Sequence, residues 1–198
     1  MVAALAWALR LDADQTQHLV QLSTPSQPSP GEVVRPSTHA MIDQLSMFPA
    51  ALLGRRADIL AWNAKGHALL ASHLDVRAPE MSATRPNWAR MLFLDKPTRR
   101  LYVDWYAKAE DTVADLHSTA ARHRDDPELQ QLIAELCRAD PDFAELWRAR
   151  PVQPCSQHTR RYRHRTLGEI ELDDQLLLLP DDPGQRLVLW TPTRIRSP

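Results

Sequence analysis

Glycine and cysteine are scarce in this chain of 198 residues, which contains five glycines and two cysteines. None of the glycines falls in a phosphate-cradling pattern, and no Gly-x-Ser-x-Gly nucleophile elbow occurs, so these signatures of nucleotide-binding and hydrolytic enzymes are missing. Cys137 and Cys155 lack metal-ligand spacing, and nothing in the pattern supports a disulfide between them. We therefore expect a reduced, cytoplasmic protein that is not an enzyme and that carries no cofactor.

Excess charge of one sign and long hydrophobic runs are also absent. Lys and Arg number 24 against 25 Asp and Glu, so no global charge attracts the chain to nucleic acid or to an anionic membrane. No stretch reaches the roughly 18 apolar residues that a membrane span needs. Three pairs of histidines are spaced six residues apart. At this spacing the two side chains of a pair do not face each other on a helix and lie far apart on a strand, so a pair is poorly placed to share a metal ion. We expect neither a metal site nor a membrane partner.

Proline, in contrast, is abundant, and it divides the chain. Four of the 16 prolines lie in residues 23–38 among Ser, Thr and Gln, a composition that stiffens the backbone and cannot build a core. We interpret this stretch as a linker. Residues 1–22 show two short helical patterns, and residues 39–198 are long enough for one domain with a core of its own.

Apolar strand patterns occur at both ends of the large domain. Residues 50–63 read as two short strands around a turn at Gly54, with a helix beginning after Asn63 as N-cap, and residues 160–192 read as three strands. Early strands must pair with late ones across about a hundred residues, so the helices between them must cover one face of a single sheet. The chain is therefore expected to be α+β, a five-stranded antiparallel sheet covered by helices with a short N-terminal helical appendage.

The middle of the chain predicts three helices with bulky apolar faces. An apolar stripe indicates one helix from about residue 98 to 122. Asp126 and Asp140 are each followed by proline, the signal of an N-cap with proline at the first helical position, so a helix is expected to begin at each.

The first two of the three late strands are expected to form a hairpin. If residues 166–168 form the loop with Gly168 in the left-handed region, opposite charges line one side while Tyr162 and His164 face inward. We interpret the arginines of the first strand as a solvated, salt-bridged set, with contact to a phosphate or a ligand carboxylate as the alternative. That register pairs Arg165 with Glu169, Arg163 with Glu171, Arg161 with Asp173, His164 with Ile170 and Tyr162 with Leu172, and the arginine set is Arg160, Arg161, Arg163 and Arg165.

Six short segments are specific as an ordered set, although each is weak alone. They are residues 58–63 (DILAWN), 92–95 (LFLD), 104–105 (DW), 126–129 (DPEL), 143–147 (FAELW) and 179–188 (LPDDPGQRLV). In order and spacing, over about residues 41–192, they resemble the ligand-binding domain of MmyB-like transcription regulators. The resemblance implies a PAS-like sensor domain that binds a fatty-acid-like ligand and adjusts transcription through an attached Xre-type helix-turn-helix, generally as a homodimer.

Residues 1–22 resemble only the last helices of such a helix-turn-helix. The chain is therefore expected to be N-terminally truncated, or a sensor without its own reader, and to contact DNA only through a reader that it largely lacks. For the ligand we expect an apolar pocket under the central helices, with Tyr162, His164 or a nearby Arg holding the carboxylate. The expected ligand-binding residues are Trp62, Leu92, Phe93, Trp105, Phe143, Trp147, Tyr162 and His164.

A second function accounts for the same aromatic residues. Aromatics at helical spacing are most often ordinary core, and sequence alone does not distinguish a filled core from a hollow one. In that case the domain would be a dimerisation or protein-interaction module with a closed core and no small-molecule ligand.

Overall fold

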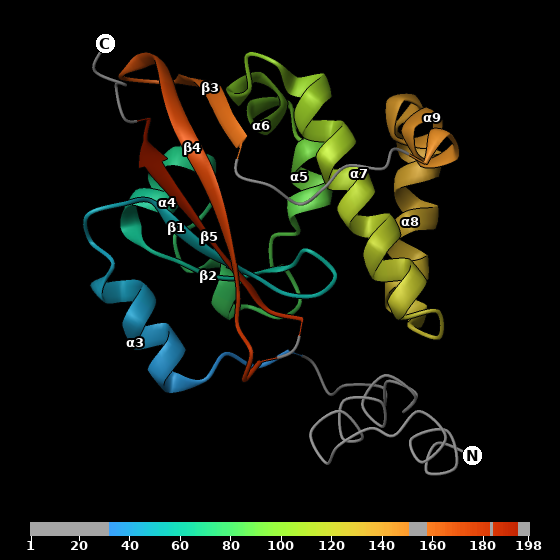
Figure 1. The fold of residues 1–198 in the computed structure, drawn as a ribbon, viewed down its shortest axis with the longest axis horizontal. Coiled ribbons are helices and arrows are strands. Elements are labelled where there is room, and N and C mark those ends of the chain that lie inside the picture. Colours follow the sequence, from blue (N-terminus) through green and yellow to red (C-terminus); the bar gives the residue numbers. More distant parts are fainter. Residues whose placement is uncertain (1–31, 151–157, 183, 194–198) are drawn as a thin grey trace, which may run out of the picture. The chain divides into compact units, whose positions relative to one another are not determined.

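The computed structural model describes residues 32–150, 158–182 and 184–193 (Figure 1). The expected helices of residues 1–22 and most of the expected linker lie outside the described residues. Five strands form one sheet in the order β2-β1-β5-β4-β3, and every neighbouring pair is antiparallel. This confirms the expected sheet, with the apolar β5 at its centre. The strands are β1 (Ala50–Leu53), β2 (Ile59–Trp62), β3 (His158–His164), β4 (Gly168–Leu178) and β5 (Arg186–Pro192).

The helices begin where short polar side chains can cap them. The side chains of Asn63, Asn87, Asp95, Asp126 and Asp140 each accept the backbone N–H three residues further along the chain. The expected N-caps at Asn63, Asp126 and Asp140 are thus confirmed. The helices are α3 (Pro36–Gln44), α4 (Ala64–Leu70), the short 3₁₀ helix η1 (Ala78–Glu80), α5 (Trp88–Leu94), α6 (Lys96–Leu101), α7 (Trp105–Arg122), α8 (Pro127–Ala139) and α9 (Pro141–Ala149).

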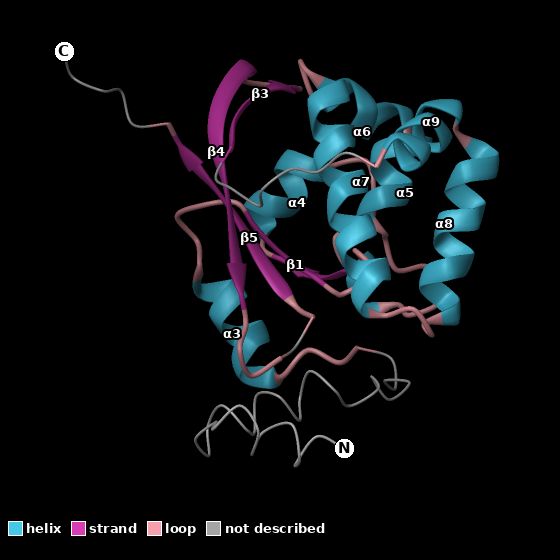
Figure 2. Cartoon of the chain, turned by 45° about the vertical axis from the view of Figure 1, so that its right-hand side comes forward, coloured by secondary structure: helices cyan, strands magenta, loops and turns pink. Residues whose placement is uncertain are grey.

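Both faces of the sheet are covered. Successive strand residues point to opposite faces, so Ala51 and Val188 join the main core under the long helices, while Leu52 and Leu187 join a second cluster with Ile42 of α3. Figure 2 shows α3 on one side of the sheet and helices α5 to α9 on the other. The large helical layer lies over one face, as expected, and α3 is an additional cover for the opposite face.

The expected single helix over residues 98–122 is wrong, because the chain leaves the helix after Leu101 and starts again at Trp105. At the break, Tyr102 forms a β-bridge with Tyr162 of β3, and the Val103 N–H donates to the Arg161 carbonyl at 3.1 Å. These contacts occupy part of the outer edge of the edge strand β3. The apolar stripe continues across the break, which is why periodicity alone does not reveal it.

The β3–β4 hairpin forms with a register that differs by two residues from the expected one. Arg163 lies opposite Glu169 and Tyr162 opposite Ile170, so the expected pairing is wrong. Gly168 has the expected positive φ of 74°, but it is the first residue of β4, directly opposite His164. The His164 Nδ1 accepts the N–H of the loop residue Leu167 at 3.2 Å, which helps to fix this shorter closure. A shift of two residues keeps every side chain on its expected face.

Gly168→Ala should lower the free energy of unfolding by about 1–2 kcal/mol, because a left-handed φ crowds a β-carbon against the backbone. Nothing lies within 4 Å of the added β-carbon, so the loss is a backbone effect alone. Gly168→Asn is the matched control, since Asn tolerates this region better, and its loss should be smaller in urea unfolding. Equal losses for the two variants would contradict the assignment to backbone strain.

Candidate functional site

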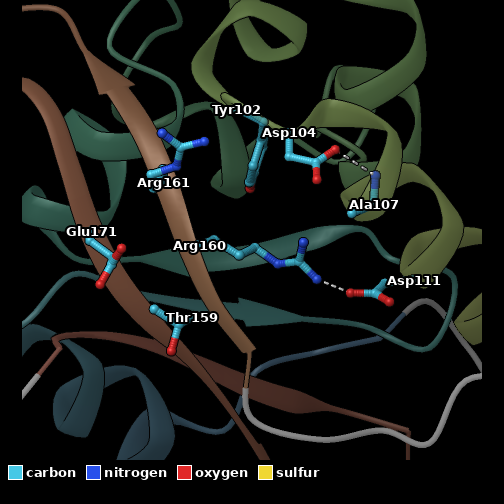
Figure 3. Close-up of a pocket in the computed structure, with 8 residues that line it drawn as sticks. All are labelled: Tyr102, Asp104, Ala107, Asp111, Thr159, Arg160, Arg161 and Glu171. Atoms are coloured by element: carbon cyan, nitrogen blue, oxygen red, sulfur yellow. Dashed lines mark hydrogen bonds and ion pairs between the residues drawn. The ribbon is translucent and has the colours of Figure 1, made fainter.

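A cavity of about 350 Å³ lies where the edge strand β3 meets the first turns of α7 (Figure 3). The break between α6 and α7 forms one wall, because it brings Tyr102 and Asp104 to the outer edge of β3. Charged side chains of both signs surround the space, which is therefore suited to a polar group rather than to an alkyl chain alone. The lining residues are Tyr102, Asp104, Ala107, Asp111, Thr159, Arg160, Arg161 and Glu171.

The two arginines of the cavity have different surroundings. Arg160 is on the inward side of β3, where its guanidinium donates to the Asp111 carboxylate of α7 and only 9% of its side chain is exposed. The expectation of a solvated Arg160 is therefore wrong, because residue 160 shares the inward face with residue 162. Arg161 points to the outer face, is 59% exposed, and is paired with Glu169 at the long distance of 3.9 Å.

A buried carboxylate joins β3 and β4 to α7. Asp174 of β4 lies 3.2 Å from the Lys108 ammonium of α7 and 3.4 Å from the Arg160 Nε, and it accepts the Tyr162 hydroxyl hydrogen bond. Trp190 of β5 in turn donates its indole N–H to the Tyr162 oxygen at 2.9 Å. Buried charges are tolerated only when they are paired, so Asp174 holds α7, β3 and β4 in one arrangement.

Aromatic rings enclose the Lys108 ammonium, which lies 5.6 Å from the Trp88 ring centroid and 6.0 Å from that of Tyr102. Burial lowers the pKa of Lys108, and the neighbouring Asp174 opposes that effect. Burial also raises the pKa of Tyr102 and of Tyr162 well above the usual value of 10.0, with further raising by Asp174. The ammonium is therefore held by its partners rather than by water.

Tyr102 and Tyr162, two of the three tyrosines, should resist ionisation as long as the protein is folded. Above pH 10.0 the unfolded chain loses phenolic protons that the folded chain keeps, so the free energy of unfolding should fall as the pH rises. Ultraviolet absorbance titration should show that the tyrosinate signal of these two residues appears together with loss of the helical circular dichroism. Full tyrosinate absorbance in the folded protein would contradict their burial.

The structure brings together five of the expected ligand-binding residues, all within the helical layer. The Phe93 ring lies 5.5 Å from Trp105 and 4.9 Å from Phe143, both edge to face, and Phe143 stacks on Trp147 at 5.8 Å. The Trp105 indole N–H donates to the Leu92 carbonyl at 2.9 Å. These rings meet at the contacts of α5, α7 and α9, and they pack on one another in this state.

The other three expected residues lie elsewhere. Trp62 is on β2, where its ring is 5.1 Å from His67 and its indole N–H donates to the Val76 carbonyl at 2.7 Å. His164 closes the hairpin, whereas Tyr162 belongs to the buried polar network under the cavity. Direct contact of these residues with a ligand stays a prediction.

Sequence reasoning offered Arg160 and Arg161 as possible contacts of a carboxylate, but it missed the charged residues of α7. Lys108, Asp111 and Asp115 follow one another at spacings of three and four on α7, so one stripe of the helix carries charge toward the sheet. Arg160 and Arg186 meet this stripe from β3 and β5, paired with Asp111 and Asp115 respectively. The spacing of these three α7 residues could have indicated a charged stripe that faces the sheet. Charged side chains on a helix are most often solvated, however, so the pattern does not distinguish a buried stripe from an exposed one.

The described residues contain neither a candidate metal site nor a membrane-spanning helix. Within them, no group of three or more His, Cys, Asp or Glu side chains is arranged to hold a metal ion. No helix in the same part of the chain has the length and apolar character to cross a membrane.

Comparison with known proteins identifies a family. No curated protein matches the chain. The family model described as the MmyB-like transcription regulator ligand binding domain matches residues 34–195, which include the whole sheet, every described helix and the lining of the cavity. The match agrees with the resemblance of the six sequence segments. The chain belongs to the family of MmyB-like transcription regulator ligand binding domains.

Proposed function

We propose that this domain is the sensor of a helix-turn-helix transcription regulator of the Xre type, and that a fatty-acid-like molecule is its ligand. The observation that carries the proposal is the position of the cavity. Its guanidinium groups lie at the start of α7, where Asp104 and Ala107 flank Trp105 of the aromatic cluster in sequence. A polar site for a head group and an aromatic ring suited to a tail therefore both lie at the start of α7.

The carboxylate would bind at Arg161. This side chain lines the cavity, and its pairing with Glu169 at 3.9 Å is too long to occupy its donors fully. Arg160 is committed to Asp111 and would add positive potential behind the site. A charge-assisted, bidentate contact between guanidinium and carboxylate is short, strong and specific in geometry.

The alkyl tail would enter the aromatic cluster of Phe93, Trp105, Phe143 and Trp147, whose rings would separate to admit it. A tail of about fourteen carbons gains on the order of 10 kcal/mol at roughly 0.8 kcal/mol per buried methylene. Separation of the rings and immobilisation of the ligand offset part of that gain. We therefore expect affinity in the micromolar range.

Occupancy would then control transcription by favouring one arrangement of the domain over another. The regulator would act in the cytoplasm as a homodimer and contact DNA through its helix-turn-helix. In this scheme, ligand binding to the domain shifts the equilibrium between its arrangements.

The test is titration of the purified protein with myristic acid, followed by native mass spectrometry and isothermal calorimetry. Arg161→Gln should weaken binding about tenfold or more, the usual effect of losing a hydrogen bond to a charged group. Arg163→Gln is the matched control, because Arg163 is on the same strand and also pairs with Glu169, yet it does not line the cavity. A protein that is empty when purified and ignores C10 to C18 acids would instead support the interaction module with a closed core.

A further inference from the structure

The turn between β1 and β2 holds a carboxylate from the segment that precedes α3. Both oxygens of Glu32 accept the Arg55 backbone N–H, at 2.9 and 3.0 Å. A β-carbon on Gly54 would lie 1.8 Å from the Glu32 Oε2, and one on Gly184 would lie 3.5 Å from the Oε1. The absence of a side chain at Gly54 therefore makes room for the carboxylate, whereas a β-carbon on Gly184 would be in ordinary contact with it.

The residues after Glu32 are fixed by the turn between β4 and β5. Arg35 donates its Nε–H to Asp182 at 2.9 Å, and its Nη2 lies 2.7 Å from the same carboxylate oxygen. The Gln185 side chain, almost fully buried, donates to the Val33 carbonyl at 3.2 Å. Two hairpin turns at one end of the sheet thus hold residues 32–35, which connect the earlier part of the chain to the domain.

The same β1–β2 turn is attached to the helical layer on its other side. The Arg56 Nε donates to both carboxylate oxygens of Asp126, at 2.9 and 3.0 Å, and the Arg55 Nη2 lies 3.4 Å from that carboxylate. Asp126 also caps α8 by accepting the Leu129 N–H at 3.1 Å. Only 7% of the Asp126 side chain is exposed, so solvent screens these ion pairs weakly.

We infer that the β1–β2 turn, residues 54–57, is a coupling element that links the position of α8 to the hold on Glu32. Arg55 is common to both sides, since its backbone binds Glu32 while its side chain binds Asp126. A displacement of the α8 N-terminus changes the ion pairs that Asp126 forms with Arg55 and Arg56. Because the same turn binds the Glu32 carboxylate, such a displacement also changes how firmly Glu32 is held. Its use in signalling rests on the proposed function, because an acyl chain entering between α5, α7 and α9 would press on α8, which packs against α9 and α5.

Cleavage of the full chain after Glu32 by a glutamate-specific protease reads this hold directly, because the carboxylate must leave its cradle to enter the protease. Asp126→Asn keeps a good N-cap but removes the charge that binds Arg55 and Arg56. It should speed cleavage after Glu32 on the order of tenfold, a typical size for coupling between sites. Asp140→Asn is the matched control, since Asp140 also caps a helix and pairs with an arginine, Arg99, away from the turn.

Gly54→Ala gives the upper limit of the cleavage rate after Glu32, because the added β-carbon displaces the Glu32 carboxylate from the turn. The fragment that begins at Val33 is quantified by mass spectrometry, and circular dichroism confirms that each variant is folded. Faster cleavage in Asp126→Asn with an unchanged rate in Asp140→Asn supports the coupling. Equal rates in wild type and Asp126→Asn overturn it, as do equal increases in the two asparagine variants.

Myristic acid added to the same assay separates this inference from the proposed function. Binding that changes the wild-type cleavage rate, with no change in Asp126→Asn, supports transmission of the ligand signal through the turn. Binding without any change in the wild-type rate overturns that transmission. If mass spectrometry finds no bound acid, the proposed ligand fails, whereas the ligand-free comparison of the variants still decides whether the turn couples α8 to Glu32.

Discussion

Asp174→Asn should destabilise the domain by about 3–5 kcal/mol, because it removes a carboxylate that Lys108 and Arg160 share and so takes a partner from a buried ammonium. The asparagine side chain can still accept a hydrogen bond from the Tyr162 hydroxyl, so the loss of stability reports the removal of the negative charge alone. Chemical unfolding in urea at pH 7, followed by circular dichroism, measures the change.

The loss should also become smaller at higher pH. Burial already lowers the pKa of Lys108, and without Asp174 the pKa falls further, so the folded variant sheds this proton while the unfolded chain keeps it up to about 10.5. The free energy of unfolding of the variant therefore rises between pH 7 and pH 9 relative to that of the wild type.

Asp173→Asn is the control, since the neighbouring residue points to the opposite face and accepts hydrogen bonds from Thr159 and Thr193. Its loss should be about 1 kcal/mol or less. If Asp174→Asn were as mild as this control, Asp174 would not be the buried partner of the two cations.

The five strands and several helix starts could be predicted because each depends on local chemistry. Asn63, Asp126 and Asp140 combine a short polar side chain with the beginning of an apolar periodicity, and each caps a helix. The apolar run at residues 187–190 is typical of a strand that is buried on both faces, and β5 is indeed the central strand of the sheet. Tertiary context did not override these local preferences.

The errors arose where a tertiary contact decides between two locally acceptable structures. Continuous periodicity favoured one helix through Tyr102, but its β-bridge with Tyr162 breaks that helix, and nothing near Tyr102 in sequence announces a partner sixty residues away. In the hairpin, a left-handed Gly168 is compatible with two loops, one over residues 166–168 and one over residues 165–167. The pairing of His164 with Gly168 selects one of them.

The candidate site was the least predictable part. Phe93, Trp105, Phe143 and Trp147 do contact one another, because bulky apolar residues at helical spacing turn inward whatever their function, and their contact with a ligand stays a prediction. Nothing in the sequence indicated the cavity, whose charged walls come from α7, β3 and β4. Burial of Arg160 depends on Asp111 and Asp174, and such an arrangement is visible only when all three elements are in place.

Phe143→Ala should lower the free energy of unfolding by about 3–5 kcal/mol, the usual loss for a fully buried aromatic ring. Phe143 has no exposed surface and touches both Phe93 and Trp147, so its removal opens a void at the centre of the aromatic cluster. Thermal unfolding followed by circular dichroism measures the loss. Tyr106 of α7 is 47% exposed, so Tyr106→Ala should lower the free energy of unfolding by less than about 1 kcal/mol under the same conditions.

The void left by Phe143→Ala also separates the two functions considered for this domain. If the cluster is where an acyl tail enters, the variant no longer has to separate Phe143 from its neighbours, and myristic acid should bind it more tightly than the wild type and restore part of the lost stability. A closed interaction module has no path from the cavity at β3 to this void. Destabilisation without any recovery in the presence of myristic acid would therefore contradict an acyl site between α5, α7 and α9 while leaving the packing role of Phe143 intact.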